Sequence, residues 1–186
     1  MRVIVCRTAM VLLGVAVVWA PILNASMVLR MDLPNLVSRA DKIFRGTVVS
    51  ISEGKVATGG IELPTVTYRL KVAEEFKGSY LVKGDERFVE ITMLAPVKRA
   101  PMGNIRAFSK LPDLPELRQG EEYLLISSAP SSGGLSTTIG IGQGAFKIFV
   151  VDKTELAVNE LNNEGLYDGP VAYAQLARDI RALVGR

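Results

Sequence analysis

Hydrophobic and polar residues alternate along the first half of the chain with the period of two that marks a half-buried strand. Residues 65–76 show this alternation most clearly, with an apolar side chain at every second position from Val66 to Val72. An earlier strand is predicted at residues 43–51, which are rich in Val, Ile and Thr, and a third at residues 87–94. The predicted core face of the third strand holds Val89, Ile91 and Met93.

Turn signals separate these strands from one another and from three more strands further along. Residues 55–62 contain two adjacent glycines and few large apolar side chains, so we expect a loop or hairpin tip there. Residues 123–127 form an apolar run typical of a strand buried on both faces. Two further strands are predicted at residues 136–141 and 145–152, separated by a tight turn or bulge at Gly142-Gln143-Gly144.

Both ends of this β-rich region show a helical pattern instead. Residues 35–40 predict a short helix, with Asp32 as its cap and Pro34 near the first turn, where a missing N–H costs little. Its predicted buried stripe is Leu33, Leu36, Val37 and Ala40. Apolar residues recur at helical spacing through residues 170–184, which predict a C-terminal amphipathic helix with Pro170 in its first turn.

The element order defines the expected fold class. About six strands with short turns, bracketed by two helices, predict a mainly β domain over residues 26–186. A small antiparallel barrel, closed or partly closed, would remove sheet edges that otherwise pair with other chains. A two-layer sandwich is the main alternative.

Residues 1–25 have the pattern of a secretory signal peptide. Arg2 and Arg7 precede an apolar run of 16 residues from Thr8 to Leu23, and small residues follow, with the expected cleavage after Ala25. The alternative is a retained anchor, for which roughly 20 apolar residues are needed. The sequence therefore predicts an exported protein, periplasmic or secreted, that contacts a membrane only if this segment is retained.

Composition excludes several kinds of chemistry. The chain has no histidine, and its one cysteine, Cys6, would leave with the signal peptide. The usual ligand sets for zinc, copper, haem and iron–sulfur clusters, and catalysis by Ser-His-Asp or Cys-His, are therefore absent from the mature sequence. Removal of Arg2 and Arg7 lowers the formal charge of +3 by two, to +1. We therefore expect no cofactor and no nucleic-acid partner.

The least ordinary stretch is the long excursion at residues 95–120, which has four prolines and no sustained period. Excursions of this length are uncommon in compact domains unless they have a role. The segment mixes basic and apolar side chains, as expected where a loop contacts an anionic polymer or another protein. Its candidate partner-binding residues are Lys98, Arg99, Arg106 and Phe108. The plainer alternative is a loop that covers the barrel, with apolar side chains inward and charges in solvent.

Adjacent carboxylates raise the question of glycan hydrolysis, in which two carboxyl groups divide the acid and base roles. The pairs are Glu74-Glu75, Asp85-Glu86 and Glu121-Glu122. Neighbouring strand residues point to opposite faces of a sheet, so we expect each pair to be solvated charge at a strand end.

Two loops carry groups that could hold a small ligand. Residues 140–144 are rich in glycine but lead into a predicted strand, not into the helix that phosphate sites require, so a turn is the better interpretation. Residues 159–164 offer oxygens to calcium but match no EF-hand spacing, and we expect a solvated loop.

Several of these segments together resemble a group of uncharacterised exported bacterial proteins. The likeness spans most of the mature chain and is carried by Ala40–Val49, Tyr68–Val72, Phe76-Lys77-Gly78, Leu117–Leu125, Gly142–Phe146 and the closing helix. The resemblance implies a barrel similar to oligonucleotide/oligosaccharide-binding folds, distantly like the netrin-like domain of metalloproteinase inhibitors. It implies no known activity. Those inhibitors chelate metal through an amino-terminal cysteine, which the mature sequence lacks.

These observations favour a non-enzymatic interaction module of the cell envelope or secreted space. Its partner would be an envelope or extracellular protein or polymer, docked by Lys98, Arg99, Arg106 and Phe108. A protease inhibitor without the metal-chelating cysteine is one alternative, and a carboxylate-based glycan hydrolase is another.

Overall fold

The computed structural model describes residues 30–58, 60–95 and 114–185. The predicted signal peptide, residues 1–25, lies outside these ranges. The four predicted docking residues Lys98, Arg99, Arg106 and Phe108 also lie outside them, so both interpretations stay predictions.

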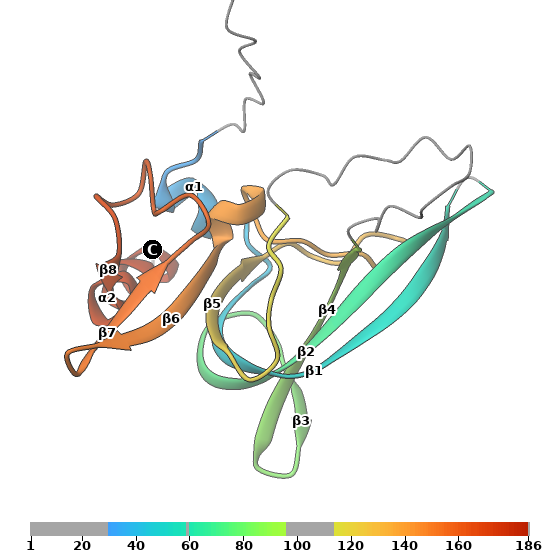
Figure 1. Cartoon of the computed structure of the whole chain (residues 1–186), viewed down its shortest axis with the longest axis horizontal. Helices are drawn as coiled ribbons and strands as arrows, with labels where there is room; N and C mark the ends of the chain where they lie inside the picture. The colour runs from blue at the N-terminus through green and yellow to red at the C-terminus, as the bar shows by residue number, and fades with distance from the viewer. Residues whose placement is uncertain (1–29, 59, 96–113, 186) are drawn as a thin grey trace, which may run out of the picture.

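Eight strands form one antiparallel sheet in the order β3-β4-β2-β1-β5-β6-β7-β8 (Figure 1). The strands are β1 (Lys42–Thr58), β2 (Ile61–Lys77), β3 (Leu81–Lys83), β4 (Glu86–Leu94), β5 (Glu122–Ser127), β6 (Ala145–Val151), β7 (Thr154–Val158) and β8 (Val171–Ala172). The helices are α1 (Leu33–Arg39), α2 (Tyr173–Val184) and the 3-10 helix η1 (Ile141–Gly144). Within the described ranges no ladder joins β3 to β8, so the sheet is open and the predicted barrel of about six strands is not confirmed.

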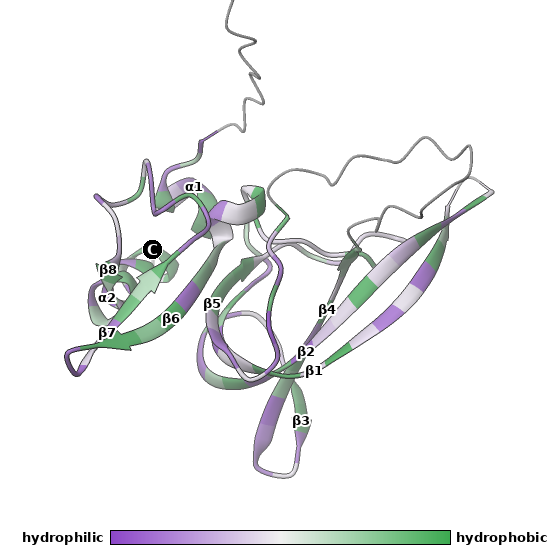
Figure 2. Ribbon diagram, in the orientation of Figure 1, coloured by the Kyte–Doolittle hydropathy of each residue, from purple (hydrophilic) through white to green (hydrophobic). Residues whose placement is uncertain are grey.

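β5 is the centre of the domain because it is buried on both faces, as its apolar run predicts. Tyr123 and Leu125 face one hydrophobic core, and Leu124 and Ile126 face the other. The three side chains from Leu124 to Ile126 are 0% exposed. The apolar stretches of β5 and β6 are visible in Figure 2. Each side of β5 therefore has its own core.

The first core lies under the two helices. Asp32 caps α1 by accepting the Asn35 N–H at 2.9 Å, and Pro34 lies in the first turn, as the sequence predicts. Leu36 and Val37 of α1 pack with Leu176 and Ile180 of α2 against the sheet. Among the described residues, neither helix combines the length and the apolar character needed to cross a membrane.

The second core lies where β1, β2, β4 and β5 curl around one another. β1 shows three register irregularities against β2, between Ile43 and Ser50, and such irregularities bend a strand. At the second one, Gly46 lets the two backbones approach, since a Cβ there would lie 2.7 Å from the carbonyl oxygen of Lys71. The bend encloses Phe44 and Leu70, both 0% exposed. Curvature thus buries a β core without closing the sheet.

The strands predicted before residue 95 are present, but β1 and β2 stay paired as far as Thr58 and Ile61, so the turn between them is much shorter than the loop or hairpin tip predicted at residues 55–62. The later strands differ in part. The predicted strand at residues 136–141 is wrong: this stretch has a single bridge, Thr138 with Ser127, and then turns into η1. β3, β7 and β8 are short strands that the pattern does not predict. The C-terminal helix begins at Tyr173 and not at Pro170, because Val171 and Ala172 pair with β7 first.

Candidate functional site

An open pocket of about 280 Å³ lies on the side of β5 that faces the second core. Its walls come from the segment before β5, the first residues of β5 and β6, and the end of β7. The lining residues are Pro115, Glu116, Leu117, Arg118, Glu121, Tyr123, Ala145, Lys147, Val158, Asn159 and Glu160. Both signs of charge therefore meet in one hollow.

A chain of hydrogen bonds fixes the polar groups of this pocket. The Arg118 backbone N–H donates to the Tyr123 hydroxyl oxygen at 3.1 Å, and that hydroxyl donates to Glu121 Oε2 at 2.6 Å. Lys147 Nζ donates to Glu121 Oε1, also at 2.6 Å. Both carboxylate oxygens of Glu121 are thus held by donors from β5 and β6.

These contacts set the protonation states. The hydrogen bond from Lys147, followed by that from Tyr123, lowers the pKa of Glu121 below its ordinary value. Burial, followed by the hydrogen bond to Glu121, raises the pKa of the Tyr123 hydroxyl. Near neutral pH the pocket therefore presents a fixed carboxylate and a fixed neutral hydroxyl, and neither group is suited to exchange a proton with a ligand.

One rim of the pocket is formed by Asn159, which is buried and fixed by a second buried asparagine, Asn163. Asn159 Oδ1 accepts the backbone N–H of Asn163 at 2.7 Å, and Asn163 Oδ1 accepts that of Asn159 at 2.8 Å. Asn159 Nδ2 also donates to the carbonyl of Gln143 at 3.1 Å. Asn159 and Asn163 are 5% and 0% exposed, so the expectation of a fully solvated loop is wrong for both. Their oxygens hold the loop together and are already engaged by backbone donors.

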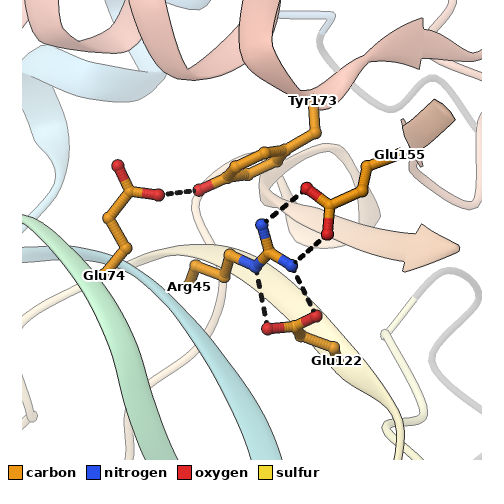
Figure 3. Close-up of polar contacts among 5 residues, drawn as sticks. All are labelled: Arg45, Glu74, Glu122, Glu155 and Tyr173. Atoms are coloured by element: carbon orange, nitrogen blue, oxygen red, sulfur yellow. Dashed lines mark hydrogen bonds and ion pairs between the residues drawn. The ribbon is translucent and has the colours of Figure 1, made fainter. Parts of the chain in front are cut away.

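A different cluster occupies the other side of β5 (Figure 3). Arg45 of β1 donates from Nε and Nη2 to both oxygens of Glu122, at 2.8 and 2.7 Å. It also donates from Nη1 and Nη2 to both oxygens of Glu155 of β7, at 3.0 and 2.6 Å. The guanidinium lies 4.3 Å from the ring centroid of Tyr173, the first residue of α2. One side chain thus connects β1, β5, β7 and α2.

Glu74 of β2 extends this cluster along α2. Its carboxylate accepts a hydrogen bond from the Tyr173 hydroxyl and pairs with Arg181, about two turns further along the helix. The Arg181 guanidinium lies 5.2 Å from the ring centroid of Phe76. We call Arg45, Glu74, Glu122, Glu155 and Tyr173, the residues labelled in Figure 3, the Arg45 cluster.

In the Arg45 cluster, the charged groups of Arg45, Glu122 and Glu155 are fixed by the hydrogen bonds between them. The hydrogen bonds that Arg45 donates to Glu122 and Glu155 raise the pKa of Arg45, and the bonds that Glu155 accepts from Arg45 lower the pKa of Glu155. Bidentate arginine–carboxylate pairs are strong and geometrically specific. The arrangement positions α2 on the sheet and leaves Arg45 few donors for a ligand.

The predicted carboxylate pair Glu121-Glu122 separates as strand alternation requires. Glu121 faces the pocket and Glu122 faces Arg45, on opposite sides of β5. The expectation of simply solvated charge is wrong for both, because each carboxylate is ion-paired. Among the described carboxyl groups with a resolved shift, Glu62, Glu121 and Glu155, each pKa is lowered. A glycosidase acid requires the opposite direction.

No group of three or more carboxylates or other metal-ligating side chains converges within residues 30–58, 60–95 and 114–185. The predicted docking residues Lys98, Arg99, Arg106 and Phe108 lie outside the described residues. Along the chain, however, their segment leads directly into Pro115 and the other pocket-lining residues before β5.

Sequence reasoning missed both polar sites. The partners of Arg45 lie 77 and 110 positions along the chain, and no local pattern predicts such contacts. The one usable signal is the alternation that sends Glu121 and Glu122 to opposite faces.

The chain matches no family model, no curated protein sequence and no solved structure.

Proposed function

We propose that the chain is an exported, non-enzymatic interaction module that docks onto an envelope or extracellular protein or polymer through the open pocket beside Glu121. One observation carries this proposal: hydrogen bonds from Tyr123 and Lys147 occupy both carboxylate oxygens of Glu121 inside an open pocket. The exported location follows from residues 1–25, as the sequence predicts.

The size of the pocket favours recognition of part of a larger partner. Sites that enclose a small molecule usually span about 300–1,000 Å³. A hollow of about 280 Å³ that is open to solvent fits one or two side chains or sugar units of a partner. Such a contact contributes to a broader interface and does not enclose a whole ligand.

The charge pattern favours a partner that carries both signs of charge or many hydroxyl groups. Arg118 and Lys147 face Glu116, Glu121 and Glu160 around the hollow. Because Lys147 already pairs with Glu121, a partner meets Arg118 as the more accessible cation. Preset charges of this kind steer and orient a partner at little cost in reorganisation.

The experiment compares capture by wild-type protein and by Arg118→Glu. The side chain of Arg118 is exposed, and only its backbone N–H bonds to Tyr123, so the fold should tolerate this change. The control is Lys83→Glu, the same charge reversal at the exposed β3–β4 hairpin. Each protein is immobilised and incubated with envelope extract, and bound proteins and glycans are identified and titrated.

The proposal expects a partner that wild type and Lys83→Glu bind equally and that Arg118→Glu binds about tenfold more weakly or not at all, the loss typical of one charge-assisted contact. Equal capture by wild type, Arg118→Glu and Lys83→Glu would show that the pocket is not part of the binding interface. Turnover of an envelope glycan by the wild-type protein would overturn the non-enzymatic assignment.

The two alternatives stay predictions. No contact among the described residues specifically favours a protease inhibitor, and the lowered carboxyl pKa values give no support to a glycan hydrolase. A titrated panel of extracellular proteases would detect the first of these activities directly.

A further inference from the structure

Three charged side chains around the pocket beside Glu121 have no partner of their own. Glu121 itself pairs with Lys147 at 2.6 Å, so these two charges balance each other. Glu116, Arg118 and Glu160 are exposed, and none of their side chains has a hydrogen-bond or ion-pair partner within the part of the chain that the structure describes. The hollow thus offers two free carboxylates and one free guanidinium to a partner.

The free charges of opposite sign come from different walls of the pocket. Arg118 belongs to the segment before β5, which its backbone N–H fixes to the Tyr123 hydroxyl at 3.1 Å. Glu160 follows the end of β7. β6 lies between β5 and β7 (Figure 1), and its Lys147 is paired with Tyr123 on one side and with Val158 on the other. The free guanidinium and the Glu160 carboxylate therefore belong to opposite sides of Lys147.

The surface between these charges is apolar. Pro115, Leu117, Ala145 and Val158 line the same pocket. Apolar walls under a charged rim suit side chains that join an aliphatic stem to a charged head, as those of lysine and arginine do. Tyr123 is 5% exposed, so it offers little ring surface for a sugar to cover. The lining therefore fits charged side chains of a protein better than it fits a glycan.

The balance of free charge argues against a partner of a single sign. Charged groups that lose water without gaining a partner are costly, so an uncharged surface that covers the rim is unfavourable. A polyanion would satisfy Arg118 but would meet the carboxylates of Glu116 and Glu160. A polycation would satisfy the two carboxylates and be repelled by Arg118. A partner that carries both signs close together complements all three groups.

Donor capacity decides where each sign of the partner binds. An ammonium group has three donors, and Lys147 uses one of them on Glu121. Lys147 therefore keeps donors for a second acceptor, and the guanidinium of Arg118 has all of its donors free. An acidic group of the partner is best placed on this side of the pocket, and a basic group toward Glu160.

We propose that the pocket binds a protein segment in which one acidic and one basic side chain lie close together, the acid held by Arg118 and Lys147 and the base by Glu160 and Glu116. This inference rests on the proposed function, because it names the partner of the same pocket. It narrows the partner to a protein with paired charges and excludes a neutral glycan and a polymer of one sign.

Synthetic peptides test this chemistry directly. The probes are acetylated and amidated Gly–Ser peptides that carry Glu and Lys at several spacings, with matched peptides in which Lys is norleucine or Glu is Gln. The full chain, isotope-labelled and purified after export, is titrated while the amide signals of Leu117, Ala145 and Glu160 are followed by nuclear magnetic resonance. At the best spacing the Glu–Lys peptide should saturate these signals with a Kd of about 1 mM, and loss of either charge should weaken it about tenfold.

Variants of the protein then assign each contact by a double-mutant cycle. Glu160→Gln should weaken the Glu–Lys peptide about tenfold and leave the Glu–norleucine peptide at its wild-type affinity. Arg118→Gln should do the reciprocal, weakening the Glu–Lys peptide and not the Gln–Lys peptide. The matched control is Glu164→Gln, on the same loop as Glu160 but outside the pocket lining, where Glu164 pairs with Arg30. This control should bind every peptide as wild type does.

Several results would overturn the inference. These are equal affinity for the Glu–Lys and Glu–norleucine peptides, a Glu160→Gln variant that weakens both alike, or no saturable shift with any peptide of the series. Failure of the inference is distinguishable from failure of the proposed function. Arg118-dependent capture of a glycan or a polyanion would support docking through the pocket and refute a protein segment of paired charge. Capture indifferent to Arg118, beside specific binding of the Glu–Lys peptide, would refute the proposed docking instead.

Discussion

The two sides of β5 use charge in different ways. On one side Arg45, with a side chain 15% exposed, binds two carboxylates and stacks on Tyr173 of α2. On the other side Lys147, 42% exposed, binds one carboxylate in an open pocket. The first arrangement connects four elements of the fold, and the second presents charge to solvent. The comparison teaches that one strand can separate a structural cluster from a more open, charged pocket, the surface that we propose for recognition.

The largest effect on stability should come from Arg45→Met. This change leaves Glu122 and Glu155 without their common cation and removes the contact with the Tyr173 ring, so we expect a loss of about 3 kcal/mol in the free energy of unfolding. Urea denaturation followed by circular dichroism measures it. Arg30→Met, at a pair whose side chains are 59% and 60% exposed, is the control and should stay within about 0.5 kcal/mol of wild type.

A smaller effect should follow from Tyr173→Phe, which keeps the ring next to Arg45 and removes only the hydroxyl that bonds Glu74. The expected loss is about 1 kcal/mol, the net value of one hydrogen bond. A loss as large as that of Arg45→Met would mean that the hydroxyl, and not the guanidinium, holds α2. The same denaturation measurement distinguishes the two.

Lys147→Met should affect partner capture more than it affects the free energy of unfolding, the opposite of what we expect for Arg45→Met. Because Lys147 is partly exposed and has one partner, its loss should cost about 1 kcal/mol or less in unfolding free energy. Capture of the partner defined with wild type should nevertheless weaken, since Glu121 then presents an unbalanced charge in the pocket. Stability loss with unchanged capture would place Lys147 among the structural residues.

The smallest effect concerns pH. Arg45 lowers the pKa of Glu155 in the folded state, so Glu155 contributes stability that is complete above its unfolded pKa of about 4.3 and is lost as the pH falls through the lower folded pKa. Glu155→Gln should therefore flatten the decline in unfolding free energy between pH 6 and pH 3. Arg45→Met should flatten it as well, because it removes the cause of the shift. A Glu155→Gln profile as steep as wild type would argue against this contribution.

Local patterns predicted much of the fold because they depend on near neighbours. The alternation before residue 95, the Asp32 cap and the apolar run of β5 each correspond to an observed element. β7 and β8 were missed because they are short and because Val171 and Ala172 continue a helical pattern that tertiary pairing overrides. An open curled sheet and a closed barrel share the same alternation, so the pattern could not distinguish them.

The polar sites were less predictable because their residues are distant in sequence. Arg45 meets Glu122 and Glu155 only after four strands, β1, β5, β6 and β7, have paired side by side. Asn159 and Asn163 resemble a solvated loop in sequence, yet their amides replace backbone partners inside a tight turn. Polar residue types alone do not show which of them will be enclosed.

Hydrogen exchange of α2 most directly tests whether the Arg45 side of β5 holds the fold together while the Lys147 side does not. Amide protection around Leu176 and Ile180 reports how firmly the helix is held to the sheet, even when the protein stays folded. The account predicts that Arg45→Met lowers this protection strongly, while Lys147→Met leaves it at the wild-type level. Unchanged protection in Arg45→Met, or an equal loss in both variants, would contradict it.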